Sequence, residues 1–171
     1  MRKLLFILAL MTGQAQASGA PEYVAPHVRS AQEVGAGRLT YLMWDVYDAT
    51  LFAPEGKWQP QRPYALTLTY LRELEGKAIA DRSIEEIRRQ GGHDEVTLAA
   101  WHSQLRAIFP DVRPRVSLTG IYTEKGETIF FENGRKIGHL LDPEFSRAFF
   151  AIWLGEKTSE PALREQLLGM R

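Results

Sequence analysis

The side chains best suited to metal binding and proton transfer are few and scattered. The chain has four histidines and no cysteine, and the histidines share no metal-ligand spacing with one another or with a carboxylate. Neither a glycine-rich phosphate loop nor a Gly-x-Ser-x-Gly nucleophile elbow occurs in the sequence. We therefore expect neither a metal site nor a cofactor. The histidines are His27, His93, His102 and His139.

Two carboxylates lie in an otherwise apolar stretch. Asp45 and Asp48 bracket Tyr47. A carboxyl group held among apolar neighbours has a raised pKa, which would suit acid–base chemistry. Such a residue more often faces solvent or caps the end of a strand, and this is the favoured interpretation. Arg38 and Arg82, taken alone, are typical surface charges.

The first half of the chain predicts strands. Residues 19–31 form an arm in which a strand begins near Val28. Residues 38–52 are rich in β-branched and aromatic side chains and predict one long strand, or two joined by a bulge. Gly35-Ala36-Gly37 precedes this strand rather than a helix and lacks a third glycine, which excludes a dinucleotide fingerprint. Residues 64–70 alternate large apolar with small side chains, as a strand with one buried face does.

The second half predicts two pairs of helices separated by a meander. Asn133-Gly134 between apolar runs is a strong hairpin signal. Hairpin connections favour an antiparallel sheet with helices gathered on one face, an α+β fold. The expected helices are 77–90, 98–108, 142–155 and a last one from Ser159 to Gly169; the expected strands are 116–122, 128–132 and 136–141.

The apolar helix at 142–155 is expected to form the centre of the core. Asp142 is a good N-cap, Pro143 suits the first helical position, and Gly155 can adopt the left-handed conformation at the end. Apolar residues cover nearly its whole circumference, so it should be packed on nearly all sides.

The N-terminus has the order of a secretory signal peptide. Arg2 and Lys3 precede the apolar run 4–11, and Ala15-Gln16-Ala17 is a small-residue cleavage site. This predicts a signal peptide at 1–17, a single domain at 18–171 and a periplasmic location, with no membrane-spanning segment after processing. Cleavage leaves 19 basic and 21 acidic residues, a formal charge of −2. That balance favours neither nucleic acid nor an anionic membrane surface as a partner.

Three stretches resemble the chalcone isomerase-like family, specifically its exported bacterial branch. They are GAGRLTYLMWDVYDATLF, YALTLTYLRELEGKAIADRSIEEI and FSRAFFAIWLG, and the most specific part is IWLGEKTSEPALREQLLG. The resemblance covers residues 34–169. It implies an open-faced β-sandwich, an antiparallel sheet with helices on one face and an apolar ligand cleft between them. Plant enzymes of the family close a flavanone ring, whereas related non-catalytic members bind fatty acids.

The resemblance also assigns positions to the family's functional residues. Its catalytic arginine falls on Arg38, and its threonine falls on Leu42, or on Tyr41 if the alignment shifts by one residue. In the helix after Gly76, the family's tyrosine, lysine and asparagine fall on Ile79, Arg82 and Glu86, so the tyrosine hydroxyl and the amide are missing. The family's pocket serine or threonine falls on Ser146.

These assignments imply a non-catalytic binder of an apolar or amphipathic small molecule such as a fatty acid. Its expected ligand-binding residues are Arg38, Tyr41, Arg82, Ser146 and Phe149, and no catalytic residue is assigned. One alternative is an isomerase or intramolecular lyase that uses a different residue set, with Arg38, Arg82 and Asp45 as candidates. Another is a structural or partner-binding module whose cleft is filled by aromatic side chains such as Phe149 and Trp153.

Overall fold

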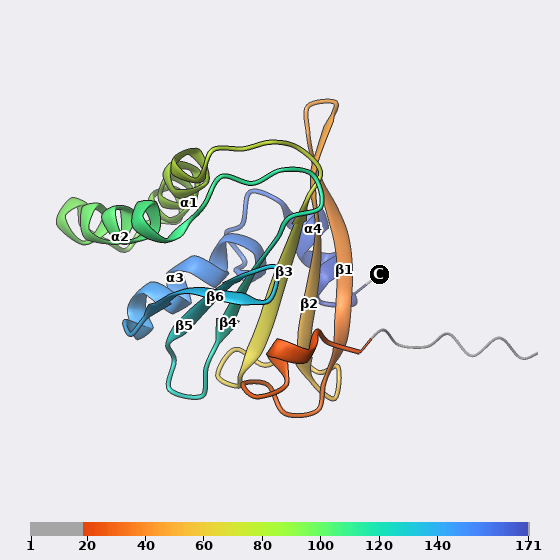
Figure 1. The fold of residues 1–171 in the computed structure, drawn as a ribbon. Helices are drawn as coiled ribbons and strands as arrows, with labels where there is room; N and C mark the ends of the chain where they lie inside the picture. The colour runs from red at the N-terminus through yellow and green to blue at the C-terminus, as the bar shows by residue number, and fades with distance from the viewer. Residues whose placement is uncertain (1–18, 171) are drawn as a thin grey trace, which may run out of the picture.

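The computed structural model describes residues 19–170 (Figure 1). The predicted signal peptide at 1–17 lies outside the described residues. Six strands form one antiparallel sheet in which each strand pairs with its neighbour in sequence. In order they are β1 (Ala31–Tyr41), β2 (Trp44–Pro54), β3 (Tyr64–Tyr70), β4 (Ser117–Tyr122), β5 (Thr128–Glu132) and β6 (Arg135–Leu140).

The four α-helices pack on one face of this sheet, as the sequence predicts (Figure 1). Their inward side chains and those of the strands form the main core, which includes Leu51, Leu66, Leu98 and Phe145. The helices are α1 (Gly76–Gln90), α2 (Glu95–Ile108), α3 (Pro143–Leu154) and α4 (Pro161–Leu167). The architecture is the predicted α+β open-faced sandwich.

The N-terminal arm covers part of the other face of the sheet. It contains the short 3-10 helix η1 (Glu22–Val24), and strand β1 begins at Ala31, later than the expected start near Val28. Val24 and Val28 are instead buried against Phe52 and Phe131 in a second, smaller core. Apart from one antiparallel bridge between Gly19 and Gln32, the arm therefore adds to the core rather than to the sheet.

Residues 38–52 are not one strand, because the chain reverses direction at Leu42 and Met43. Tyr41 pairs with Trp44, and a bulge between Leu39 and Thr40 shifts the register beside the turn. The apolar composition that predicted one long strand, or two joined by a bulge, belongs to the tip of a long hairpin. No glycine, proline, asparagine or aspartate occupies the turn, so the usual sequence signal for a turn is missing.

Helix α3 starts as predicted and ends differently. The Asp142 carboxylate accepts hydrogen bonds from the backbone N–H groups of Glu144 (2.9 Å) and Phe145 (3.2 Å). Gly155 does not adopt the expected left-handed conformation, since its φ is −74°. A Cβ on Gly155 would lie 2.7 Å from the Ala151 carbonyl oxygen, so space rather than backbone conformation favours glycine there.

Gly35 and Gly37 have a packing role. A Cβ on Gly35 would lie 2.1 Å from the backbone oxygen of Gln166, and one on Gly37 would lie 2.8 Å from a methyl group of Leu163. These contacts let α4 lie directly against β1. The Gly-Ala-Gly sequence is therefore explained by close packing of a helix on a strand.

Candidate ligand-binding cavity

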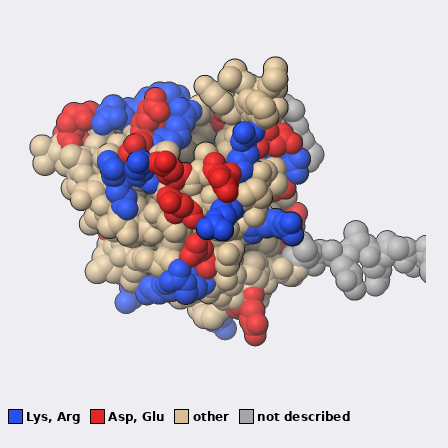
Figure 2. Space-filling model, turned by 45° about the horizontal axis from the view of Figure 1, so that its top comes forward, with Lys and Arg blue, Asp and Glu red and all other residues tan. Residues whose placement is uncertain are grey.

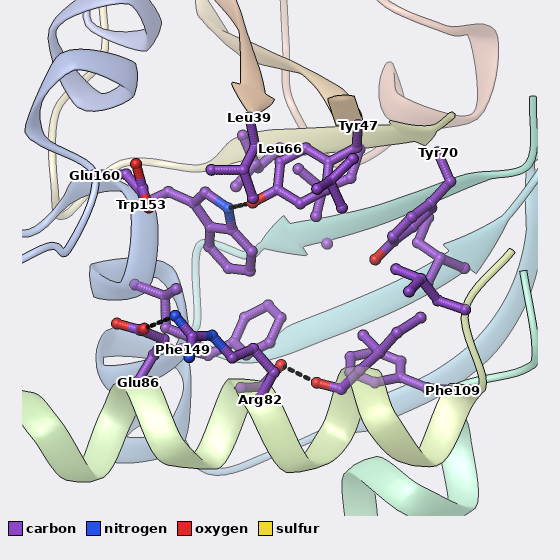
Figure 3. A pocket seen from close by; sticks show the side chains of 18 of the residues that line it. Leu39, Tyr47, Leu66, Tyr70, Arg82, Glu86, Phe109, Phe149, Trp153 and Glu160 are labelled. Carbon is purple, nitrogen blue, oxygen red and sulfur yellow. Dashed lines mark hydrogen bonds and ion pairs between the residues drawn. The ribbon is translucent and has the colours of Figure 1, made fainter. Parts of the chain in front are cut away.

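A cavity of about 440 Å³ lies between the sheet and helices α1 and α3 (Figure 3). This volume falls within the range of small-molecule binding sites, about 300 to 1,000 Å³. Its apolar wall comes from β1 to β5, α1 and α3. The apolar lining residues are Leu39, Val46, Leu66, Leu68, Leu74, Ala78, Ile79, Phe109, Leu118, Gly120, Phe130, Phe149, Phe150, Ile152 and Trp153.

Strand alternation explains the wall. Leu66, Leu68 and Tyr70 are two residues apart in β3, so all three point from one face of the sheet into the cavity. Phe149 of α3 makes edge-to-face contacts with Phe130 and with Trp153, and the ring centroids are 5.3 Å apart in each pair. These aromatic side chains form a rigid wall, and they leave the space between α1 and the sheet open.

Two tyrosine hydroxyls interrupt the apolar surface. The Tyr47 hydroxyl accepts a hydrogen bond from the indole N–H of Trp153 at 2.9 Å, which leaves its own O–H free to donate. Tyr70 is 2% exposed, and its hydroxyl points into the cavity without a hydrogen bond to any of residues 19–170 (Figure 3). Each hydroxyl is therefore a donor available to a ligand.

Both phenols remain protonated at neutral pH. Burial raises the pKa of Tyr47 to about 12, although the hydrogen bond from Trp153 acts in the opposite direction. Burial also raises the pKa of Tyr70, and the neighbouring Tyr47 adds to the effect. Neither tyrosine can serve as a general base at neutral pH, so both fit hydrogen-bond donation better than proton abstraction.

A charged cluster lies at one edge of the cavity, around the buried Glu86. This carboxylate is 2.6 Å from Nη2 of Arg82 and 3.0 Å from Nη2 of Arg89, and it accepts a hydrogen bond from the Ser159 hydroxyl at 3.0 Å. Both arginines are about half exposed. Arg82 also contacts Glu85 at 3.2 Å. A guanidinium group is thus held at the edge of the cavity, paired with Glu86 (Figure 3).

Three of the five expected ligand-binding residues line this cavity. Tyr41 lies at the exposed edge, Arg82 lies in the charged cluster, and Phe149 forms part of the wall. Arg38 and Ser146 are not among the lining residues. Of the two arginines expected to bind the ligand, Arg82 lines the cavity and Arg38 does not.

Arg38 lies on the opposite face of the sheet. It neighbours Leu39, which lines the cavity, and successive side chains of a strand point to opposite faces. Its Nε and Nη2 donate to Asp48 at 2.6 and 3.0 Å, and its Nη1 donates to Asp45 at 2.9 Å. Arg38 is therefore paired with two carboxylates in an exposed cluster outside the cavity.

The raised pKa that the acid–base hypothesis requires of Asp45 is not found. This carboxylate accepts a hydrogen bond from Thr40 at 2.7 Å and one from Arg38, and these contacts lower its pKa. The side chain is about half exposed. The Asp45 carboxylate is therefore ionised near neutral pH. Its exposure and its lowered pKa both agree with the solvent-facing interpretation.

Ser146 is fully buried and has a structural role. Its hydroxyl donates to the Asp142 carbonyl oxygen at 3.1 Å and accepts from the Thr128 hydroxyl at 2.6 Å. The bonds tie the first turn of α3 to β5. This accounts for a polar residue inside an otherwise apolar helix.

Sequence reasoning identified Tyr41 but not Tyr47 and Tyr70, the other two tyrosines that line the cavity. Tyr70 could have been found, because the alternation over 64–70 places it on the buried face with Leu66 and Leu68. Tyr47 was hidden by the unrecognised turn at Leu42 and the bulge that follows it. Among residues 19–170, the structure holds no group of three or more side chains suited to metal binding and no helix with the length and hydropathy of a membrane span.

Sequence comparison identifies the family. The chalcone isomerase-like profile matches residues 31–169, which is most of the chain. The chain belongs to the chalcone isomerase-like family. An uncharacterised protein of Haemophilus influenzae is 33% identical over 140 residues, covering 81% of this chain and 68% of that protein.

A solved structure shares the fold of this chalcone isomerase-like chain. It is the crystal structure of a fatty-acid binding protein from Arabidopsis thaliana, with a TM-score of 0.63 and 14% identity. The match covers 82% of this chain and 87% of that one. This confirms the predicted open-faced sandwich.

Proposed function

We propose that this chalcone isomerase-like protein binds an apolar or amphipathic small molecule, such as a fatty acid, without transforming it. The observation that carries the proposal is the 440 Å³ cavity, whose wall is mostly apolar and whose polar groups include two unused O–H donors. A site of this kind buries a hydrocarbon chain and orients one polar group. The likeness in fold to a fatty-acid binding protein supports the same ligand class.

The polar group of the ligand is assigned to Arg82 rather than to Arg38. Both arginines are paired with two carboxylates, but Arg82 lines the cavity, whereas Arg38 lies on the other face of the sheet. A carboxylate beside Arg82 would form a charge-assisted hydrogen bond. The hydroxyls of Tyr47 and Tyr70 supply neutral donors deeper in the cavity.

The proposal predicts no chalcone cyclisation. Ile79 lines the cavity at the position where the family's enzymes, by resemblance, have a tyrosine, and its hydrocarbon side chain donates no hydrogen bond to an enolate. When a chalcone is incubated with the purified protein, its visible absorbance should fall no faster than it does without protein. A parallel displacement titration, with fatty acids competing for a fluorescent fatty-acid analogue, should show saturable binding. Turnover well above background would contradict the non-catalytic assignment.

We further propose that the protein is exported and acts in the periplasm. Support comes from the charged, apolar and small-residue order of residues 1–17. The mature chain is then expected to begin at Ser18. N-terminal sequencing of protein from a periplasmic fraction checks this, and a product that retains Met1 in the cytoplasm would overturn it.

A further inference from the structure

The tip of the β1–β2 hairpin is an exposed apolar projection. It extends beyond the rest of the molecule at the top of Figure 1. Its four consecutive side chains are Tyr41, Leu42, Met43 and Trp44, with exposed fractions of 60, 82, 84 and 55%. Four adjacent large apolar residues, each more than half exposed, are unusual on a soluble surface and indicate an interaction site. We call residues 41–44 the apolar finger.

Folding does not require a leucine at this turn. Leu42 has a φ of 55°, in the left-handed region where a side chain with a Cβ is disfavoured. Glycine would suit this position better. The chain thus places a large apolar side chain where local conformation opposes it, so the side chain needs another explanation.

One basic side chain contacts the base of the finger, and a second arginine lies on a neighbouring segment. The guanidinium of Arg72 lies 4.3 Å from the centre of the Trp44 ring. Backbone hydrogen bonds join Leu71 to Val46 at the base of the finger and Arg115 to Tyr70 beside it. Arg72 and Arg115 are exposed, and neither forms an ion pair within residues 19–170.

Positive charge near the finger is a local feature and does not extend over the surface of the molecule. Figure 2 shows basic and acidic side chains intermixed over one face of the molecule, without a large area of one sign. On the other side of the finger, Asp45 and Asp48 are paired with Arg38, whereas Arg72 lies against Trp44 without an ion pair among residues 19–170. The finger therefore combines an apolar tip with one unpaired cation at its base and a second on a neighbouring segment.

We propose that the apolar finger inserts into the headgroup region of a lipid bilayer. Leucine and methionine side chains at the tip would reach the acyl chains, and tyrosine and tryptophan are the side chains that favour the membrane interface. Arg72 and Arg115 would then lie at the level of the lipid phosphates. Four side chains are far fewer than the roughly 20 to 30 residues per side of a stable protein interface, which favours a bilayer over a protein partner.

Insertion would bring the cavity to the source of its ligand. Tyr41 belongs both to the finger and to the lining of the cavity, so the two features are continuous. This second step rests on the proposed function, since it requires an apolar ligand that resides in membranes. The insertion itself does not, and it can be tested without any ligand.

The test is co-sedimentation with vesicles of phosphatidylcholine, alone or mixed with phosphatidylglycerol. The wild-type chain, residues 18–171, should pellet with both, and more strongly with the anionic mixture. The double variant Leu42→Gly, Met43→Ser removes the apolar tip, and glycine suits the left-handed turn, so the variant should fold normally. Its affinity for vesicles should fall by about tenfold or more. Arg72→Gln with Arg115→Gln should abolish the preference for anionic vesicles.

A matched control removes two exposed apolar side chains elsewhere. Val96 and Met170 are 81 and 65% exposed, and replacing both by serine should leave vesicle binding unchanged. Lipids with brominated acyl chains should quench Trp44, which is more exposed than the other tryptophans. The proposal is overturned if the wild type stays in the supernatant with both vesicle types. It is also overturned if the finger variant instead abolishes a concentration-dependent dimer, because a second copy of the chain would then be the partner.

Discussion

Replacing Ser83 by tryptophan should lower the affinity for dodecanoate by about a hundredfold or more. Ser83 is buried on the side of α1 that lines the cavity, and its hydroxyl donates only to the Ile79 carbonyl within the same helix, at 2.8 Å. An indole at this position would occupy space that the ligand needs. Displacing about four buried methylene groups, at about 0.8 kcal/mol each, costs about 3 kcal/mol of binding.

The same arithmetic predicts a chain-length series for the wild type. Affinity should rise by about fourfold for each added methylene until the cavity is full, and Ser83→Trp should stop the rise at a shorter chain. Isothermal titration with octanoate, dodecanoate and hexadecanoate measures this. Ser103→Trp is the matched control, because Ser103 lies exposed on α2 and away from the cavity lining. Equal affinities of Ser83→Trp and wild type, with both folded, would show that ligands bind elsewhere.

Replacing Arg82 by methionine should remove the preference for a fatty acid over its methyl ester. A carboxylate next to a partly desolvated guanidinium is stabilised by about 1.5 to 3 kcal/mol, equivalent to about ten- to a hundredfold in affinity. The methyl ester lacks the charge, so its affinity should change little. Glu86 keeps its contacts with Arg89 and Ser159 in the variant, so the fold should persist.

Arg38→Met is the matched control for Arg82→Met. Arg38 is an exposed arginine paired with two aspartates outside the cavity, so its loss should change binding by less than about 0.5 kcal/mol. The comparison consists of titrating each variant with dodecanoate and methyl dodecanoate. Loss of the acid preference in Arg38→Met but not in Arg82→Met would reverse the assignment. Its retention in both variants would move the polar contact to Tyr47 and Tyr70.

The fold follows from sequence because its signals are local. Alternation over residues 64–70 identifies strand β3, although the structure buries both of its faces rather than one, and Asn133-Gly134 fixes a hairpin. The capping carboxylate of Asp142 and the proline after it mark the start of α3. Where prediction failed, at Leu42 and Met43, the turn has apolar residues in place of turn formers. An apolar tip at that turn is what the proposed insertion into a bilayer would select.

The site was harder to predict, because it depends on which strand face each residue occupies. A shift of one residue moves a side chain to the other face of the sheet. Arg38 and Leu39 are neighbours in sequence, yet Leu39 lines the cavity and Arg38 does not. Arg82, which the family resemblance rather than helical spacing assigned to the cleft, lines the cavity. The bulge beside Leu39 could not be inferred from composition.

Native mass spectrometry of the protein purified from its own cells tests whether the cavity holds a small molecule. We expect a species heavier than the bare chain by the mass of an amphipathic ligand, which organic extraction releases and added dodecanoate replaces. Ser83→Trp prepared in the same way should carry little or none of it, whereas Ser103→Trp should carry as much as the wild type. A wild-type protein that has only the mass of the bare chain, and that takes up no fatty acid when dodecanoate is added in excess, would contradict the proposed binding function.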